Sequence, residues 1–321
     1  MDTNELFEPF VRMLETICPP AAVRAVEQGE PIGAIWDEFN ASGFLDALVD
    51  EDRGGAGLSL SDLEPLFEAL GANAVPLPVG ETMIARALLA RAEIEFGQGP
   101  IALATSQYGP VPGWLVADQI LVDDGVHLVL LDNAAVRSGS SAAPGIFELA
   151  NGALRRQMMP RPAGGLRLLA AVLRSAMIAG AAGRLLETSV AFANERAQFG
   201  KPIGRQQALQ QNLAVMAQDT VAVRIAVQMG CACDLEPNPQ AAAVAKVTAS
   251  TAAGRIAATA HAIHGAIGIS EEFDLQLLTR RLHEWRLADG SESYWSAMLG
   301  NARLSSSKRS VEWVRTAVSG S

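Results

Sequence analysis

Aromatic side chains and lysine are scarce in this 321-residue sequence. Aromatic residues make up 5% of it, and the lysines are Lys201, Lys246 and Lys308, so almost every cationic side chain is an arginine. Asp and Glu outnumber Lys and Arg by 35 to 25, which gives a formal net charge of −10. No basic block is present, and binding to nucleic acid or to an anionic membrane depends on positive charge. We therefore expect neither as a partner.

Cysteine is also rare, with 3 residues in the chain. An odd count with the spacing Cys231-Ala232-Cys233 fits neither a disulfide framework nor a CxxC motif. The sequence therefore predicts reduced thiols in a cytoplasmic protein. His261 and His264 lie one helical turn apart, but no third ligand is visible, so we expect no metal site.

A long uncharged apolar run is missing as well. The most apolar stretch, residues 166–186, is interrupted by Arg167, Arg174 and Arg184, so we expect no membrane-spanning helix. The N-terminus begins with acidic rather than basic residues, and no targeting segment is apparent. Hydrophobic residues make up 49% of the chain, which excludes intrinsic disorder and predicts an ample core.

Three regions differ in pattern, and together they predict an α+β protein that is mostly α. Residues 1–96 show helical periodicity, including a helix that begins after Ser59 or Ser61 and ends near Gly71. Residues 97–163 contain short runs rich in Ile, Val and Leu at 101–105, 119–122 and 127–132, with a hairpin turn at Asp123-Asp124-Gly125. We interpret this region as a small β domain.

Residues 164–321 are expected to form a four-helix-type bundle. The expected helices span residues 166–196, 206–234, 237–262, 271–285 and 292–314. The stretch 240–260 is rich in alanine, which is a strong helix former and lets helices approach closely.

One motif in this bundle carries chemical information. The segment Arg196-Ala197-Gln198-Phe199-Gly200-Lys201-Pro202-Ile203 ends a long helix. Arginine offers a fork for phosphate oxygens, phenylalanine can stack on a planar ring, and glycine admits a ligand to the backbone. The alternative is an ordinary helix C-terminus with a solvated arginine, and the motif alone favours that alternative.

The order of several segments resembles the acyl-CoA dehydrogenase family. The segment R-x-Q-F-G-x-P-I is one of them. Others are Gly54–Ser59 with Ala72–Pro76, which resemble the N-terminal helical domain, and Ala262–Ile269, which resembles the Q-x-x-G-G-x-G segment. Residues 285–293 fall where the family has its Y-E-G-T loop. The resemblance covers essentially the whole chain and shares its helix–sheet–helix layout.

The resemblance implies an enzyme that binds FAD at a subunit interface and oxidises acyl-CoA thioesters to 2-enoyl-CoA. In the family a carboxylate removes the α-proton, the β-hydrogen leaves as hydride to the flavin, and electron transfer flavoprotein is the electron acceptor. The residues that the resemblance assigns to cofactor binding are Arg196, Gln198, Phe199, Gly200, Gln207, His264, Gly265, Gly268 and Ser291. Of these, Arg196, Gln198 and Phe199 would contact the adenosine end of an FAD held mostly by a neighbouring subunit.

Several departures from the family pattern are concentrated around the flavin ring. Neither T-E-P-x-x-G-S-D nor K-x-W-I-x-N occurs between residues 97 and 163, and Thr105–Gly109 is at best a remnant. Ala262 and Ala266 replace a Gln and a Gly of the family segment. The sequence is also short for the family, mainly in the β domain. These features resemble the short subunits of heterotetrameric dehydrogenases that act on steroid side-chain CoA thioesters.

The catalytic base is open in the sequence. Asp289-Gly290-Ser291 stands where the family has Glu-Gly-Thr, and the family's other position for the base falls near Ala170. Asp289 is therefore the candidate base, with Glu292 as a weaker one. In the alternative reading Asp289 only caps the following helix, and Glu292 only favours that helix's dipole.

Three aromatic residues cluster around this loop, namely Trp285, Tyr294 and Trp295. They could line an acyl or flavin pocket, but core packing is the more frequent explanation for aromatics at helical spacing.

Three functions are compatible with the sequence. The first is a subunit of a heteromeric acyl-CoA dehydrogenase whose homologous partner brings the base. The second is a self-sufficient homo-oligomer that uses Asp289. The third is a structural or regulatory partner that binds no flavin.

Overall fold

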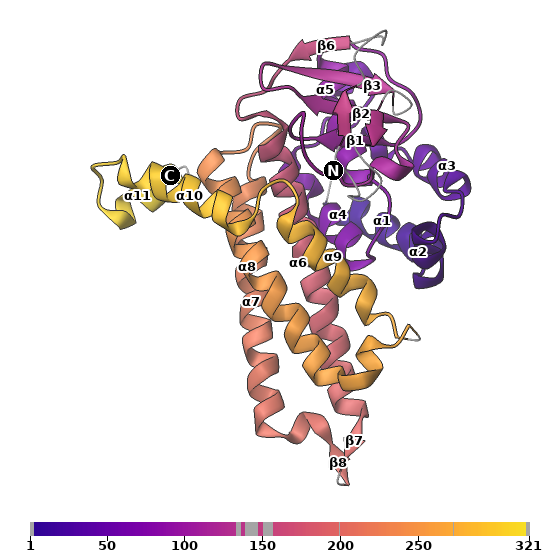
Figure 1. Cartoon of the computed structure of the whole chain (residues 1–321), viewed down its shortest axis with the longest axis vertical. Helices are drawn as coiled ribbons and strands as arrows, with labels where there is room; N and C mark the ends of the chain where they lie inside the picture. The colour runs from indigo at the N-terminus through magenta and orange to yellow at the C-terminus, as the bar shows by residue number, and fades with distance from the viewer. Residues whose placement is uncertain are drawn as a thin grey trace.

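The computed structural model describes residues 3–132, 136–138, 147–149, 157–198, 200–271 and 273–318. Figure 1 shows a small sheet at one end of the molecule and a long helical bundle that extends from it, with further helices packed beside their junction. The predicted fold class, mostly helical with a small β region, is confirmed. The predicted boundary after residue 96 falls between the last helix of the first region and the first strand. The one after residue 163 falls between the last strand and the first helix of the bundle.

The N-terminal region consists of helices joined by short turns. These are α1 (Thr3–Ile17), α2 (Pro20–Glu27), α3 (Gly33–Ser42), α4 (Leu60–Ala72) and α5 (Val79–Arg91). The predicted start of α4 is confirmed by a capping box, in which the Asp62 amide donates to Ser59 Oγ (3.2 Å) and the Ser59 amide donates to Asp62 Oδ2 (2.9 Å). Two otherwise unpaired backbone donors are satisfied in this way.

The middle region forms a four-stranded sheet in the order β1-β2-β3-β6. Its strands are β1 (Ile101–Ala104), β2 (Gln119–Asp123), β3 (His127–Asp132) and β6 (Gln157–Pro160), and β4 (Val136–Ser138) pairs separately with β5 (Phe147–Leu149). The predicted β2–β3 hairpin is confirmed, because Asp124 Oδ1 accepts from the amides of Val126 and His127 in its turn. β1 pairs with β2 in parallel, a pairing that short-range patterns do not indicate.

The bundle is built from α6 (Gly165–Glu195), α7 (Gln207–Cys231), α8 (Pro239–His264) and α9 (Leu275–Leu287). Glycine allows α4 and α6 to touch along their backbones. A Cβ on Gly71 would lie 1.9 Å from the Met177 carbonyl oxygen, and one on Gly180 would lie 1.8 Å from that of Glu68. The N-terminal helices are therefore packed directly on the bundle.

The prediction of one helix over residues 292–314 is wrong. The chain forms α10 (Glu292–Leu304) and α11 (Ser310–Ala317), which project to the side in Figure 1. A run of serines separates the two helices, and Ser306 provides local hydrogen bonds there: its Oγ accepts from the Lys308 amide and its carbonyl accepts from Arg303. Serine competes in this way with the regular helical pattern.

α6 is long and apolar enough to cross a bilayer, but 94% of its most apolar window is buried inside the protein. A core helix of a globular protein has the same properties.

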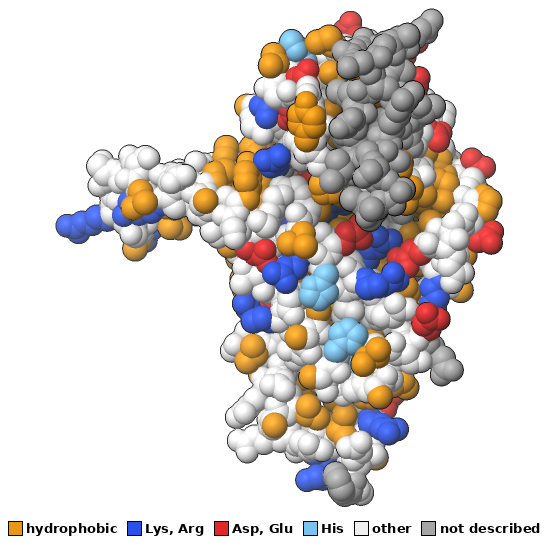
Figure 2. Space-filling view, in the orientation of Figure 1, with side chains coloured by type: hydrophobic (Ala, Val, Ile, Leu, Met, Phe, Trp, Pro, Cys, Tyr) orange, Lys and Arg blue, Asp and Glu red, His pale blue; other side chains and the backbone are white. Residues whose placement is uncertain are grey.

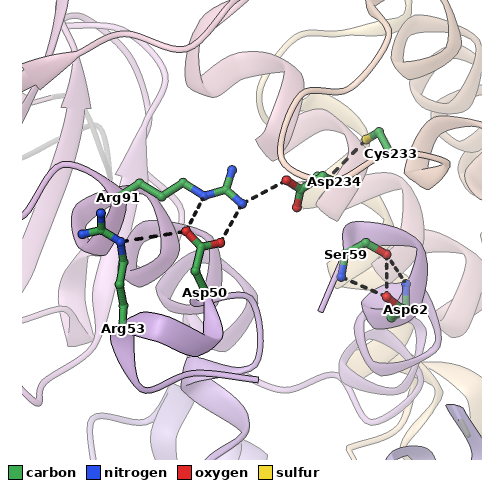
Figure 3. A network of polar contacts seen from close by, with 7 residues as sticks. All are labelled: Asp50, Arg53, Ser59, Asp62, Arg91, Cys233 and Asp234. Carbon is green, nitrogen blue, oxygen red and sulfur yellow. Dashed lines mark hydrogen bonds and ion pairs between the residues drawn. The ribbon is translucent and has the colours of Figure 1, made fainter. Parts of the chain in front are cut away.

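Polar contacts also connect the N-terminal helices to the bundle. Figure 3 shows Arg91, at the end of α5, between Asp50 and Asp234. Its Nη2 lies 3.0 Å from Asp50 Oδ1 and 2.9 Å from Asp234 Oδ2, the latter in the connection between α7 and α8. These side chains are partly exposed, so the pairs fix an orientation more than they add stability.

Candidate functional site

The cofactor residues predicted around the end of α6 lie at one end of the bundle. Arg196 follows α6, and the hairpin of β7 (Ala197–Gln198) and β8 (Lys201–Pro202) leads to Gln207 at the start of α7. The side chains of Arg196, Gln198 and Gln207 are exposed. Among the described residues, no hydrogen bond or ion pair joins these three side chains to another group. Gly200 turns the hairpin with φ +79° and open space around it. Phe199 lies outside the described residues.

The second predicted cofactor segment reaches the same end, because α8 runs antiparallel to α7 and finishes there. His264 is buried, stacks on Phe192 with 4.4 Å between ring centroids, and places Nδ1 2.8 Å from the Ala260 carbonyl oxygen. Burial lowers the pKa of His264, which favours a neutral ring. His264 thus packs the end of α8 against the end of α6 inside the protein.

The two predicted glycines of this segment differ in what they do. Gly265 has φ +62° and no atom within 4 Å of a Cβ built on it, so its backbone is open to the outside. A Cβ on Gly268 would lie 2.9 Å from both His264 Cβ and Leu275 Cδ2, so that glycine is required for packing. We name this group of residues, from Arg196 to Gln207 together with Gly265, the hairpin end.

The loop Ala288–Ser291 lies at the other end of the bundle, between α9 and α10. Asp289 Oδ2 is 3.3 Å from Arg174 Nε, and Arg174 Nη2 is 2.5 Å from Glu81 Oε1. All three side chains are at most 3% exposed. Burial by itself lowers the pKa of the Arg174 guanidinium, but the two carboxylates outweigh burial and raise it above its usual value. We name this group of residues the loop end.

The expectation that Asp289 caps the following helix is wrong. Ser291 is the N-cap residue of α10, and no side-chain hydrogen bond caps that helix. The Asp289 carboxylate instead faces Arg174, which offers a charged partner inside the protein. Ser291 itself is separated from the other predicted cofactor residues by the length of the bundle, so the structure does not bring it together with Arg196 in one chain.

A cavity of about 320 Å³ opens beside the loop end. It lies between the segment Thr105–Tyr108, the start of α6 at Gly164 and Arg167, and Tyr294 on α10. The remnant segment that the sequence singled out therefore faces the beginnings of two bundle helices. Asp289 is not among the residues that line the cavity.

Arg167 at the cavity wall and Arg174 in the buried charge cluster are site residues that sequence reasoning did not single out. Arg167 lies over the Tyr294 ring at 4.9 Å from its centroid, a cation–π contact at the cavity wall. Both arginines interrupt the apolar run of α6. That interruption was the available signal, because a charge on the buried face of a core helix requires a partner.

Of the three aromatic residues near the loop, two belong to the packed core and one lines a pocket. Trp285 and Trp295 are buried in the core, whereas Tyr294 is 44% exposed and lines the cavity. Glu292, the weaker candidate base, accepts a hydrogen bond from Arg286 Nε at 2.9 Å.

Charges of both signs mix on the face shown in Figure 2, where blue and red side chains lie side by side across the middle of the molecule. A larger cavity, of about 640 Å³, lies between α1, α4, α6 and α9 and contains none of the predicted site residues. Among the described residues, no group of three metal-ligating side chains occurs.

Comparisons with known proteins identify the family. A model of the acyl-CoA dehydrogenase C-terminal domain matches residues 169–302. Acyl-CoA dehydrogenase IpdE2 of Mycolicibacterium smegmatis is 31% identical over 291 residues, covering 87% of this chain and 91% of that protein. IpdE2 of Mycobacterium tuberculosis is 33% identical over 282 residues, covering 82% and 85%. The chain belongs to the acyl-CoA dehydrogenase family of oxidoreductases.

Solved structures share the fold. The ChsE4-ChsE5 complex of Mycobacterium tuberculosis matches with a TM-score of 0.81 at 21% identity, covering 95% of this chain and 98% of that one. A steroid acyl-CoA dehydrogenase, Tcur3481-Tcur3483, matches with a TM-score of 0.78 at 24% identity, covering 94% and 98%.

Proposed function

We propose that this chain is a subunit of an FAD-dependent acyl-CoA dehydrogenase that acts in a heteromeric complex with a homologous catalytic subunit. The reaction is the α,β-dehydrogenation of an acyl-CoA thioester. One observation carries the proposal: the hairpin end follows the last residue of α6, whereas the cavity beside the loop end lies at the first turns of that helix. That helix has 31 residues, which at about 1.5 Å per residue is ~45 Å.

An FAD molecule is too short to span that distance. A flavin that contacts Arg196 therefore cannot place its ring beside the cavity at the loop end of the same chain. The exposed hairpin end instead suits a flavin whose ring is held by another chain. Each end of this subunit would then complete a site with a different part of the complex.

The residues of the hairpin end fit the adenosine and phosphate part of FAD. The Arg196 guanidinium and the Gln198 amide are exposed and have no hydrogen-bond or ion-pair partner among the described residues, and Gly265 has an open backbone. Such groups bind phosphate oxygens and ribose hydroxyls by charge-assisted and neutral hydrogen bonds. When bound, FAD supplies the acceptor for the hydride that leaves the β-carbon. The chain's own contribution at this end is binding and orientation.

The burial and pairing of Asp289 support the heteromeric arrangement. Its carboxylate is buried, paired with Arg174 and absent from the cavity wall. A base must come within hydrogen-bond reach of the proton that it removes. The fold match to ChsE4-ChsE5, a complex of two different chains, supports the same arrangement.

The match to a steroid acyl-CoA dehydrogenase supports a CoA thioester of a steroid-derived acid as the substrate. Electron transfer flavoprotein would be the electron acceptor, and the cytoplasm the location, as the family resemblance and the reduced cysteines suggest.

Two alternatives stand beside this proposal. A self-sufficient enzyme would use Asp289 as its base, and the Asp289–Arg174 pair would then have to open during turnover. A structural partner would bind no flavin at all.

A visible spectrum distinguishes the three. We expect the purified chain alone to be colourless, and the complex with a co-expressed homologous dehydrogenase subunit to contain flavin and to oxidise an acyl-CoA. A stoichiometric flavin band with activity in the chain alone would contradict the heteromeric proposal. A fully active partner whose flavin content and turnover do not change when this chain is left out would also contradict it.

A further inference from the structure

The loop end contains charges that the proposed reaction does not use. Arg174, in the first third of α6, is 2% exposed and lies between Glu81 on α5 and Asp289 in the loop. Two carboxylates thus share one guanidinium in the interior. Buried charges are costly unless they are paired, so this triad is stable only while all three side chains stay in place.

The triad fixes an unusual backbone conformation. Asp289 has φ +58° and Gly290 has φ +112°, two consecutive residues in a region that side chains rarely occupy. The carboxylate of Asp289 is held inside by Arg174, which compensates for this conformation. Gly290 is required here because a Cβ would lie 2.6 Å from Trp295 Nε1 and 2.8 Å from Tyr294 Cδ1.

A buried lysine holds the chain just before the loop. Lys246 Nζ, on α8, donates to the carbonyl oxygens of Trp285 (2.6 Å) and Arg286 (3.1 Å), in the last turn of α9. A cation at this place pairs with the negative end of the α9 dipole. The loop is therefore anchored from the bundle interior at two points: Lys246 holds the last turn of α9 before it, and Arg174 holds Asp289 within it.

The loop is in direct contact with the cavity. Gly290 packs against the ring of Tyr294, and Tyr294 forms part of the cavity wall and carries Arg167 over its face. A change in the Asp289 backbone therefore moves the Tyr294 side of the cavity. No other element of the described structure separates Gly290 from that ring.

We propose that Arg174 is a positioning residue, which acts through Asp289 and Gly290 to set the place of Tyr294 at the cavity wall. Glu81 has the matching role of holding the guanidinium. The consequence for binding rests on the proposed function, namely that this cavity takes part of an acyl-CoA thioester. The effect of Arg174 on the backbone of the loop does not depend on that function.

The test is a conservative change, Arg174→Lys, made in the co-expressed complex. Lysine keeps the charge but cannot reach both carboxylates with a planar fork. We expect amide hydrogen exchange in residues 286–294 to become at least tenfold faster, with no change in residues 196–207. We also expect the dissociation constant of octanoyl-CoA, used as the probe, to rise about tenfold.

The matched control is Arg255→Lys. Arg255 on α8 forms a bidentate pair with Asp219 on the surface, so we expect it to change neither exchange in the loop nor binding of the probe. If Arg174→Lys does not fold, the variant Glu81→Gln/Arg174→Met/Asp289→Asn removes all three charges together, and its loop should also exchange faster.

Protection of residues 286–294 equal to that of the wild type, in whichever of these variants folds, would overturn the proposal. Failure of the wild-type complex to bind either octanoyl-CoA or a CoA thioester of a steroid-derived acid would instead count against the proposed function. The exchange measurement needs no ligand, so it tests the loop independently.

Discussion

The charged and polar side chains at the two ends of the bundle differ in burial and in pairing. At the loop end, Arg174, Glu81 and Asp289 are buried and paired with one another. At the hairpin end, Arg196, Gln198 and Gln207 are exposed, and their side chains form no hydrogen bond or ion pair with another described residue. Both ends carry segments by which the sequence resembles the same family, so the difference is one of role within the subunit.

This difference separates positioning from binding. A buried charge that is fully paired stabilises one conformation and is unavailable to a ligand. An exposed fork of donors on a short hairpin contributes little to folding and suits recognition of an anion by another molecule. The predictions below test whether the two ends divide these tasks.

Arg174→Met should cause the largest loss. It leaves the carboxylates of Glu81 and Asp289 buried without their cation, and breaking a buried pair costs about 3–5 kcal/mol in unfolding free energy. Urea denaturation measures the loss. Arg255→Met, at a surface pair, should cost at most about 1 kcal/mol, and equal losses in the two variants would remove the contrast between buried and exposed charges.

Arg196→Ala should leave stability nearly unchanged and weaken flavin binding. Losing charge-assisted hydrogen bonds worth about 1.5–3 kcal/mol lowers the flavin affinity of the co-expressed complex by roughly tenfold or more. Flavin retained on gel filtration measures this effect. Arg255→Ala, at the surface pair with Asp219 outside the hairpin end, is the control and should retain flavin. A complex that holds flavin equally well in both variants would contradict the role of the hairpin end.

Lys246 gives the loop end a pH dependence. Burial lowers the pKa of Lys246 from 10.5 to about 7 in the folded protein, against the opposing effect of Asp289. Between those two values the unfolded chain binds the extra proton, so this group makes stability increase as pH rises, by up to about 1.4 kcal/mol per pH unit.

Lys246→Met should abolish that increment, which unfolding free energies of both proteins from pH 7 to 10 would show as a difference. Glu64 titrates in the opposite direction. Its pKa is raised to about 8, mainly by burial and by Glu68, and it makes stability fall between about pH 4.5 and 8. Identical pH profiles for wild type and Lys246→Met would contradict the assignment to Lys246.

Tyr294→Ala should have the smallest effect on folding. The exposed cation–π contact with Arg167 is worth about 0.5–1 kcal/mol, and the side chain is 44% exposed. Binding of octanoyl-CoA should nevertheless weaken, as measured by titration calorimetry. Weaker binding would make Tyr294 a binding residue of the cavity beside the loop end. A large loss of stability with unchanged binding would instead assign it to the core.

Features set by neighbouring residues could be predicted from the sequence. The Ser59 cap of α4, the β2–β3 hairpin and the long helices of the bundle depend on local spacing and turn residues. The break between α10 and α11 was missed because Leu304 and Val311, on either side of the serine run, are seven residues apart and so keep a helical spacing. The parallel pairing of β1 with β2 has no local signature at all.

The site shows the same division. The motif from Arg196 to Gly200 is contiguous and stands out in the sequence. The partner of Asp289 lies 115 residues away in the chain, so no spacing rule connects the two. In the sequence Arg174 is only an interruption of an apolar helix, because its two partners come from α5 and from the loop after α9.

Turnover of the co-expressed complex that carries Asp289→Asn in this chain is the most direct test of the central claim. The substitution keeps the shape of the side chain and leaves Arg174 paired with Glu81. We predict full flavin content and retained turnover, because the catalytic base belongs to the partner. Full flavin content with turnover abolished would contradict the account and make Asp289 the base.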